Sequence, residues 1–244
     1  KVEADEQYRR AYDLLVAGGG IEPDARDRLL LELLLDWAQV HYYQGRFGDL
    51  RELFESHEAL PGMVGDDALA ARWLAWSGHL HQNVCGELPE SIDLLEAALA
   101  LGRTSGDATA EAYARAWLPW ALRLAGRGDE VAGHWERLLA LLPEVPDPHD
   151  RRYVHIKGMG GMATVEAIRG NTVAARRLAD ELFAVGADTG NRRAVAMAYA
   201  AMIAVHVGRG DLDAAIATCE VADEQDFDPV YRHVGRVWSA GLQA

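Results

Sequence analysis

The most constraining feature of this 244-residue chain is a glycine-centred turn that occurs five times between apolar-periodic segments. Gly45, Gly86, Gly126, Gly170 and Gly208 mark these turns, and they lie 41, 40, 44 and 38 residues apart. A period of this size indicates repeated copies of one supersecondary unit, each packed on its neighbours. We therefore expect a repeat array, not a compact fold around a single centre.

The segments on both sides of each turn have helical periodicity. Apolar residues recur at three- and four-residue spacing before the turn, as in LLLELLLDWAQVHYY, and after it, as in DLRELFESHEAL. No segment of useful length alternates as a strand does. The sequence predicts an all-α chain with one repeat domain, 1–244. Its helical hairpins are expected at about 24–60, 66–102, 107–142, 148–186 and 189–224, with partial repeats at 1–17 and 228–244.

Composition excludes several classes of function. The 38 acidic and 24 basic residues give a net charge of −14, which repels phosphate backbones and argues against direct nucleic-acid binding. No apolar run approaches the roughly 18 residues of a membrane span. The two cysteines, Cys85 and Cys219, are too few for a disulfide framework, so a reducing cytoplasm is expected. Because Lys1 opens the chain without Met and inside a helical pattern, we expect a longer parent polypeptide.

The helical pairs resemble tetratricopeptide repeats in the segments GRFGDLREL, GDEVAGHW and GDLDAAIATCEVA. That family has a glycine before the turn, a large apolar residue after it, and alanine where helices cross. The units here are a few residues longer and lack the usual closing proline. The linkers at 99–112 and 182–196 are similar to repeats found behind the ATP-binding domains of bacterial LuxR-type regulators and ATPase-linked adenylate cyclases. The resemblance implies a right-handed α-solenoid of about five repeats that serves protein–protein interaction, signal transduction or transcription regulation.

In a solenoid of this type the first helices line a concave groove. Aromatic rings beside hydrogen-bonding and cationic groups are typical of a pocket for a peptide, sugar or other amphipathic ligand. The tetratricopeptide register places these candidate groove residues: Gln39, Tyr42, Tyr43, Trp73, Trp76, Asn83, Tyr113, Trp120, Arg123 and Lys157.

Some aromatic positions have two interpretations. For Tyr42, Trp73, Trp76 and Trp120, exposure in the groove and packing between helices both stay open. Packing alone is expected for Trp37, Trp117 and Trp135. Pro119, inside AWLPWALRL, is predicted to bend its helix and thereby to displace Trp120 and Arg123.

No catalytic residue, metal site or cofactor is predicted. His79 and His81 lie two residues apart, so on a helix they point about 200° away from each other and cannot share a metal. The run KGMGG at 157–161 lacks the Gly-Lys-Ser/Thr ending of a phosphate loop. We interpret its glycines as small residues that let two helices approach.

These observations predict a non-catalytic domain of a larger bacterial regulatory protein. Its partners would be a protein or peptide segment, or a small effector, bound in the concave groove, together with neighbouring domains of the same polypeptide. One alternative is a structural spacer that also forms homo-oligomers through its terminal helices. A third hypothesis, an enzyme in its own right, has no visible site to support it.

Overall fold

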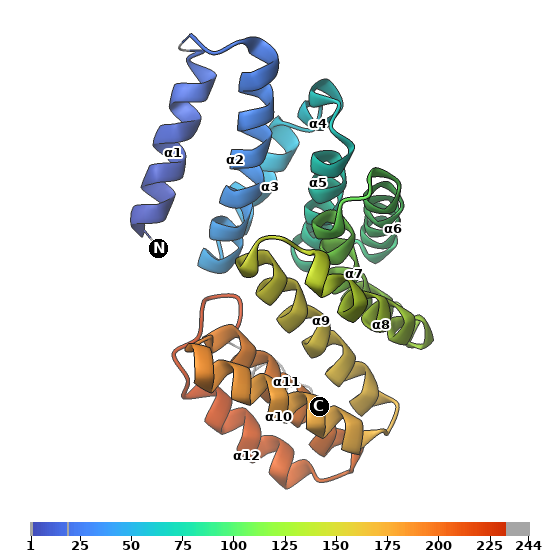
Figure 1. Ribbon diagram of the computed structural model, residues 1–244. Coiled ribbons are helices and arrows are strands. Elements are labelled where there is room, and N and C mark those ends of the chain that lie inside the picture. The colour runs from blue at the N-terminus through green and yellow to red at the C-terminus, as the bar shows by residue number, and fades with distance from the viewer. Residues whose placement is uncertain (1, 19, 233–244) are drawn as a thin grey trace. The chain divides into compact units, whose positions relative to one another are not determined.

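The computed structural model describes residues 2–18 and 20–232, and within them the chain is helical without any strand (Figure 1). The prediction of an all-α chain is confirmed. Residues 233–244, which carry most of the expected last partial repeat, lie outside the described residues. No helix in the described part has both the length and the apolar character needed to cross a bilayer.

The chain divides into two compact units, Lys1–Ala114 and Arg115–Ala244. The boundary falls inside helix α7 (Ala108–Leu124). Unit 1 contains α1 (Val2–Val16), α2 (Pro23–Gln44), α3 (Phe47–Ser56), α4 (Leu60–Val64), α5 (Asp67–Leu80), a π-helical turn (His81–Cys85) and α6 (Leu88–Ser105). Unit 2 contains α8 (Val131–Leu141), α9 (Pro148–Ile168), α10 (Thr172–Thr189), α11 (Arg192–Gly208) and α12 (Leu212–Asp223), with short 3₁₀ turns at Gly128–Glu130 and Leu142–Glu144.

Local sequence signals explain where these helices begin and end. Asp66, Asp147 and Asn191 are N-cap residues whose side chains accept hydrogen bonds from the first free backbone N–H groups of α5, α9 and α11. The turn glycines have the left-handed backbone conformation that closes a helix C-terminus. They are Gly45, Gly86, Gly126, Gly170 and Gly210, with φ between 71° and 81°. The fifth turn is thus centred on Gly210, since Gly208 is the last residue of α11.

In unit 1, α2 packs against its neighbours α1 and α3 and against α5, and α5 packs against α6. The indole Nε1 of Trp37 donates a hydrogen bond of 2.8 Å to Asp5, which ties α1 to α2. Figure 1 shows α1 and α2 side by side and running in opposite directions. Trp37 is buried, as expected.

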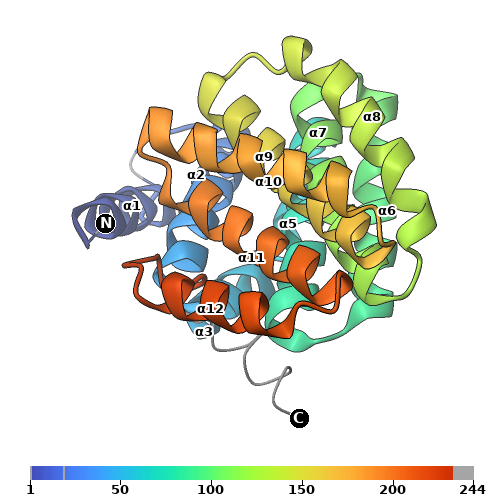
Figure 2. The ribbon, with the colours of Figure 1, turned by 90° about the horizontal axis from the view of Figure 1, so that it is seen from below.

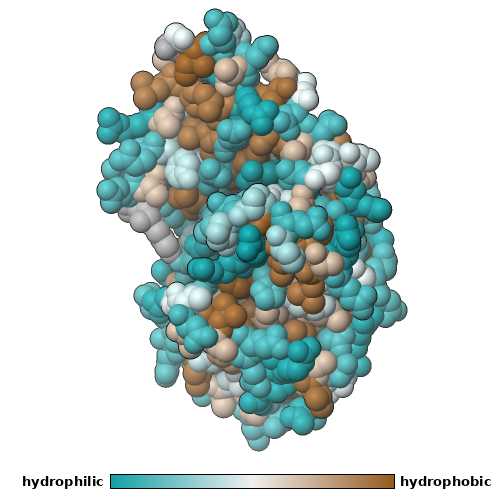
Figure 3. All heavy atoms as spheres, viewed as in Figure 1, coloured by the Kyte–Doolittle hydropathy of each residue, from teal (hydrophilic) through white to brown (hydrophobic). Residues whose placement is uncertain are grey.

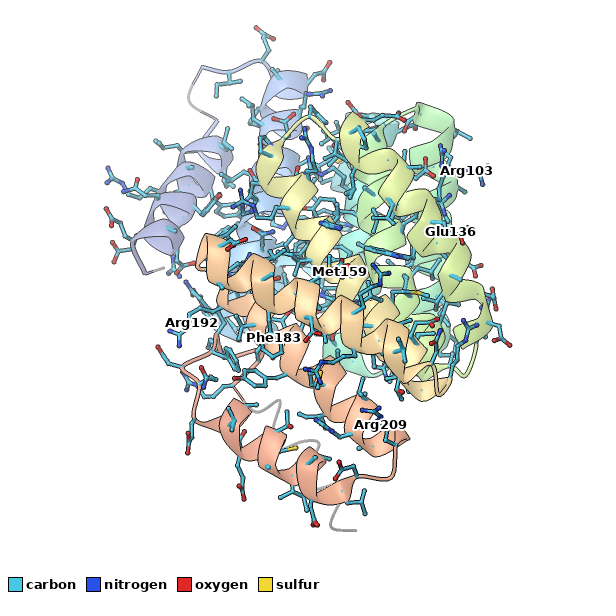
Figure 4. All side chains as sticks on the ribbon, turned by 60° about the horizontal axis from the view of Figure 1, so that its bottom comes forward. Arg103, Glu136, Met159, Phe183, Arg192 and Arg209 are labelled. Atoms are coloured by element: carbon cyan, nitrogen blue, oxygen red, sulfur yellow. The ribbon has the colours of Figure 1, made fainter. Side chains whose placement is uncertain are left out.

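In unit 2, α9 packs against α10 and α11, and α11 packs against α10 and α12. Figure 2 shows α10, α11 and α12 side by side. Met159 lies in the core that α9, α10 and α11 share, whereas Arg192 and Arg209 are exposed at the edge of the unit (Figure 4).

The KGMGG run lies within α9 and allows close packing, as interpreted from the sequence. A Cβ atom on Gly160 would lie 2.8 Å from the sulfur of Met197, which is closer than side chains approach. A larger residue here would therefore require Met197 to move within a packed core. Pro119 lies inside α7, which continues as a helix to Leu124; the bend expected there stays a prediction.

Candidate functional site

Most of the predicted groove residues of unit 1 are buried. Tyr42, Tyr43, Trp73, Trp76 and Tyr113 have exposed fractions between 2% and 5%. The expectation that their rings form an accessible wall therefore requires correction, and helix packing is the interpretation that fits, although Trp73 also lines a hollow described below. Burying an aromatic ring removes a large apolar area from water, which favours packing wherever a neighbouring helix can cover the ring.

These buried rings contact one another or other side chains of unit 1. The ring centroid of Tyr42 lies 5.1 Å from that of Tyr43 and 6.2 Å from that of Trp76. The guanidinium of Arg72 lies 5.8 Å from the ring centroid of Tyr113. Two other predicted groove residues of this unit keep access to solvent: Gln39 is half-buried and Asn83 is exposed.

Three predicted groove residues of unit 2 form a second cluster. The indole Nε1 of Trp120 donates to the backbone oxygen of Lys157 at 3.1 Å, and the guanidinium of Arg123 lies 5.7 Å from the Trp120 ring centroid. Trp120 and Arg123 are half-buried, but Lys157 is buried, so its expected place on a groove wall also requires correction. Burial lowers the pKa of Arg123 and, more strongly, that of Lys157.

A hollow of about 390 Å³ lies in unit 1 between α3, α5 and α6. This volume falls within the range of about 300–1,000 Å³ that is usual for small-ligand sites. Its apolar wall includes Phe54, Trp73, Leu74 and Leu94. Phe54 and Trp73 stack with ring centroids 4.1 Å apart. Trp73 is the one predicted groove residue that lines the hollow.

Charged side chains surround this pocket. Four glutamates line it, together with one arginine: Glu55, Glu58, Glu87, Glu90 and Arg51. The Nε of Arg51 donates to Glu55 at 2.6 Å, and this bond, followed by the charge of Glu55, raises the pKa of the guanidinium. The rim therefore carries more negative than positive charge.

The C-terminal end of α5 brings three potential metal ligands to the same rim. His81 and Cys85 belong to the π-helical turn, and Glu87 follows the turn glycine. One ligand atom from each residue lies within 4.8 Å of the other two. The Nδ1 of His81 is 2.8 Å from Oε2 of Glu87, at hydrogen-bonding distance.

The sequence contains a signal for this cluster that the pairing of His79 with His81 misses. His81 and Cys85 are four residues apart, the spacing that places two side chains on one helix face. The side-chain amide of Asn83 instead donates its Nδ2–H to Nδ1 of His79, at 3.1 Å. A comparison of His81 with the residues that follow it in the sequence, in place of His79 before it, would have identified the cluster.

A second hollow of about 300 Å³ lies between α1, α2 and α3. The backbone oxygen of Leu53 can only accept, so Nδ1 of His57 donates to it at 2.9 Å. In the neutral ring Nε2 is then an acceptor, and the hydroxyl of Tyr12 donates to it at 3.2 Å. These three groups therefore satisfy one another's hydrogen bonds.

Comparison with protein-family models found no match, and none of the curated proteins searched is similar to the chain.

Proposed function

We propose that this chain is a non-catalytic ligand-binding domain of a regulatory protein, built as a tetratricopeptide-like right-handed solenoid of stacked helical hairpins. Its ligand is cationic and amphipathic: a basic peptide segment or a small apolar amine. The observation that carries the proposal is the 390 Å³ pocket with its stacked aromatic wall and glutamate-rich rim. The bound state would be passed to neighbouring domains of the same polypeptide.

The contacts within each unit support stacking of hairpins. In unit 1, α2 contacts its hairpin partner α3 and also α5, the first helix of the next hairpin. In unit 2, α9 contacts α10 and α11 in the same way. A helix that contacts its partner and the next equivalent helix is what a repeat array requires.

The pocket lining favours a ligand with both apolar and positively charged parts. Phe54, Trp73 and Leu94 would cover an apolar side chain, and aromatic rings also attract cations. The glutamates of the rim would attract an amine or guanidinium and repel an anionic ligand. The net charge of −14 acts in the same direction at long range.

The proposal is tested by calorimetric titration with two matched peptides. One is a short apolar peptide with two arginines, and the other has citrulline at both positions, which keeps the shape and removes the charge. We expect the arginine peptide to bind at least about tenfold more tightly, because two partly exposed ion pairs contribute up to about 1 kcal/mol each. The double variant Glu58→Gln, Glu90→Gln should remove most of this difference.

Glu136→Gln is the matched control for this experiment. Glu136 is an exposed glutamate on α8 of unit 2, outside the pocket (Figure 4). It should leave the affinity for the arginine peptide unchanged. Equal affinities for the two peptides, or an equal loss in the control and in the double variant, would show that the pocket does not select a cationic ligand.

A second candidate function, self-association, is favoured by apolar side chains on α1. Leu14 and Val16 have exposed fractions of 72% and 56%. Figure 3 shows apolar residues gathered at the top of the view, where α1 and α2 meet. Apolar residues grouped on a surface are typical of an interaction site.

Self-association through α1 predicts that Leu14→Lys reduces the molar mass measured by light scattering from a dimer to a monomer. Val173→Lys, at a residue that is 79% exposed in unit 2, is the control and should leave the mass unchanged. A wild-type protein that is monomeric at 100 μM or above, roughly the range of weak dimers, would exclude this candidate.

A further inference from the structure

The glycine turn at Gly86 differs from the other four by one residue. In a regular turn the residue after the glycine donates its N–H to the carbonyl oxygen five positions earlier, which is the hydrogen bond of a Schellman cap. Four of the turns have this bond: Arg46 to His41, Arg127 to Leu122, Asn171 to Glu166 and Asp211 to His206. At Gly86 the bond of 3.1 Å joins Glu87 to His81, six positions earlier.

The extra residue is accommodated by the π-helical turn His81–Cys85. Such turns are rare, and they occur frequently at functional sites. Here the wider turn brings the backbone of Glu87 back onto His81 and leaves Cys85 beside both. The insertion thus produces a group of three side chains that the other four turns do not share.

We infer that His81, Cys85 and Glu87 form a binding site for Zn²⁺ at the rim of the pocket. Zn²⁺ is bound in proteins by histidine nitrogen, cysteine sulfur and carboxylate oxygen at about 2.0–2.3 Å. Ligand atoms in a tetrahedral zinc site are therefore roughly 3.3–3.8 Å apart. The three atoms here lie within 4.8 Å of one another, so a zinc ion would draw them closer by up to roughly 1.5 Å.

The surroundings of the cluster suit an entering cation. The side chains of His81 and Glu87 are 30% and 60% exposed, which gives the ion a path from solvent. Glu55, Glu58 and Glu90 line the same pocket and add negative charge, whereas the one arginine is paired with Glu55. Three protein ligands leave one position of a tetrahedral zinc ion for water or for a ligand in the pocket.

Co²⁺ serves as the probe, since it takes the place of Zn²⁺ and absorbs light when a thiolate binds it. Titration of the full chain should give one Co²⁺ per molecule with a thiolate-to-cobalt charge-transfer band, and Zn²⁺ should displace the Co²⁺. Cys85→Ser should abolish the band and weaken Zn²⁺ binding by at least about 100-fold. Cys219→Ser is the matched control, because Cys219 is the other cysteine and is buried on α12. This variant should keep both the charge-transfer band and the Zn²⁺ affinity.

A second variant guards against a folding defect in Cys85→Ser. Glu87→Gln changes an exposed side chain and should weaken Zn²⁺ binding by about tenfold while the helical circular dichroism stays unchanged. The inference is overturned if Co²⁺ does not bind, if it binds without the thiolate band, or if the two cysteine variants behave alike.

Zinc binding does not require that the pocket also take a cationic organic ligand. The double variant Glu58→Gln, Glu90→Gln should retain the cobalt band, because neither glutamate belongs to the cluster. A band without peptide binding would therefore reject the proposed function and support the zinc site, and the opposite result would reject only the zinc site.

Discussion

Replacing Lys157 by methionine should stabilise the protein near neutral pH and change the pH dependence of its stability. Lys157 is buried, and its Nζ is 2.6 Å from the hydroxyl of Tyr231. Burial, and then the charge of Arg193, lower the pKa of this amine from 10.5 to about 7. The native state therefore holds the proton more weakly than the unfolded chain does.

The sign of the effect follows from proton uptake. Between the native pKa of about 7 and the unfolded pKa of 10.5, unfolding takes up a proton at this site, so raising the pH stabilises the native state. Below about pH 7 the cost of the buried charge is fully present. We expect the free energy of unfolding of the wild type, minus that of Lys157→Met, to increase by about 1 kcal/mol per pH unit from pH 7 to pH 9.

Denaturant unfolding at several pH values between 7 and 9 measures this difference in the free energy of unfolding. Because both proteins contain the same other titrating groups, the contributions of those groups cancel in the difference. Tyr231→Phe is the control: it removes the hydroxyl that faces Lys157 and keeps the amine, so most of the pH dependence should stay. Parallel pH profiles for the wild type and Lys157→Met would contradict the prediction, since they would mean that the amine titrates normally in the native state.

Gly102→Ala should destabilise the protein, although alanine is the better helix former. Gly102 is buried in α6, where the backbone of α7 passes directly over it. An added Cβ would lie 2.8 Å from the backbone nitrogen of Glu111 and 3.2 Å from the carbonyl carbon of Ala110. A backbone cannot move aside as the end of a flexible side chain can, so we expect a loss of about 1–3 kcal/mol.

Gly133→Ala is the matched change at a helical glycine without this contact. Gly133 is exposed in α8, and no described atom outside its own helix backbone lies within 4 Å of the position that an added Cβ would take. Alanine should stabilise this helix by about 0.5–1 kcal/mol. The two variants should thus change the free energy of unfolding in opposite directions, and denaturant unfolding measures both changes. A stabilising Gly102→Ala would mean that α6 and α7 can separate without cost.

The sequence predicts the helices of this chain well because their signals are local. Apolar spacing indicates the longer helices, although not the five-residue α4, and a left-handed glycine ends many of them. The choice between two glycines is not local. The tetrapeptide GRGD occurs twice, at 126–129 and at 208–211. In the first copy the leading glycine, Gly126, forms the turn after α7, whereas in the second copy the other glycine, Gly210, forms the turn after α11. Gly208 stays helical, where a Cβ would lie 2.9 Å from the backbone oxygen of Ala167 on α9.

The candidate site is predicted less well because exposure depends on which helices cover a given face. Periodicity indicates that Tyr42 and Trp76 lie on first helices, but it does not indicate that they are buried. His81 and Cys85 have the four-residue spacing of one helix face, but the place of Glu87 beside them depends on one extra residue in the turn, which a regular helical wheel does not show. Trp73 is the predicted residue that does line the pocket.

Contacts between helices that are adjacent, or next but one, in the chain also bear on how this protein reaches its native state. When α9 contacts α10 and α11, only short loops must close before apolar surface is buried. Proteins dominated by such local contacts have low contact order and fold quickly, and repeat arrays can nucleate at more than one place. In the proposed solenoid either unit would therefore supply a folding nucleus, and the order of events would follow whichever hairpin is locally most stable.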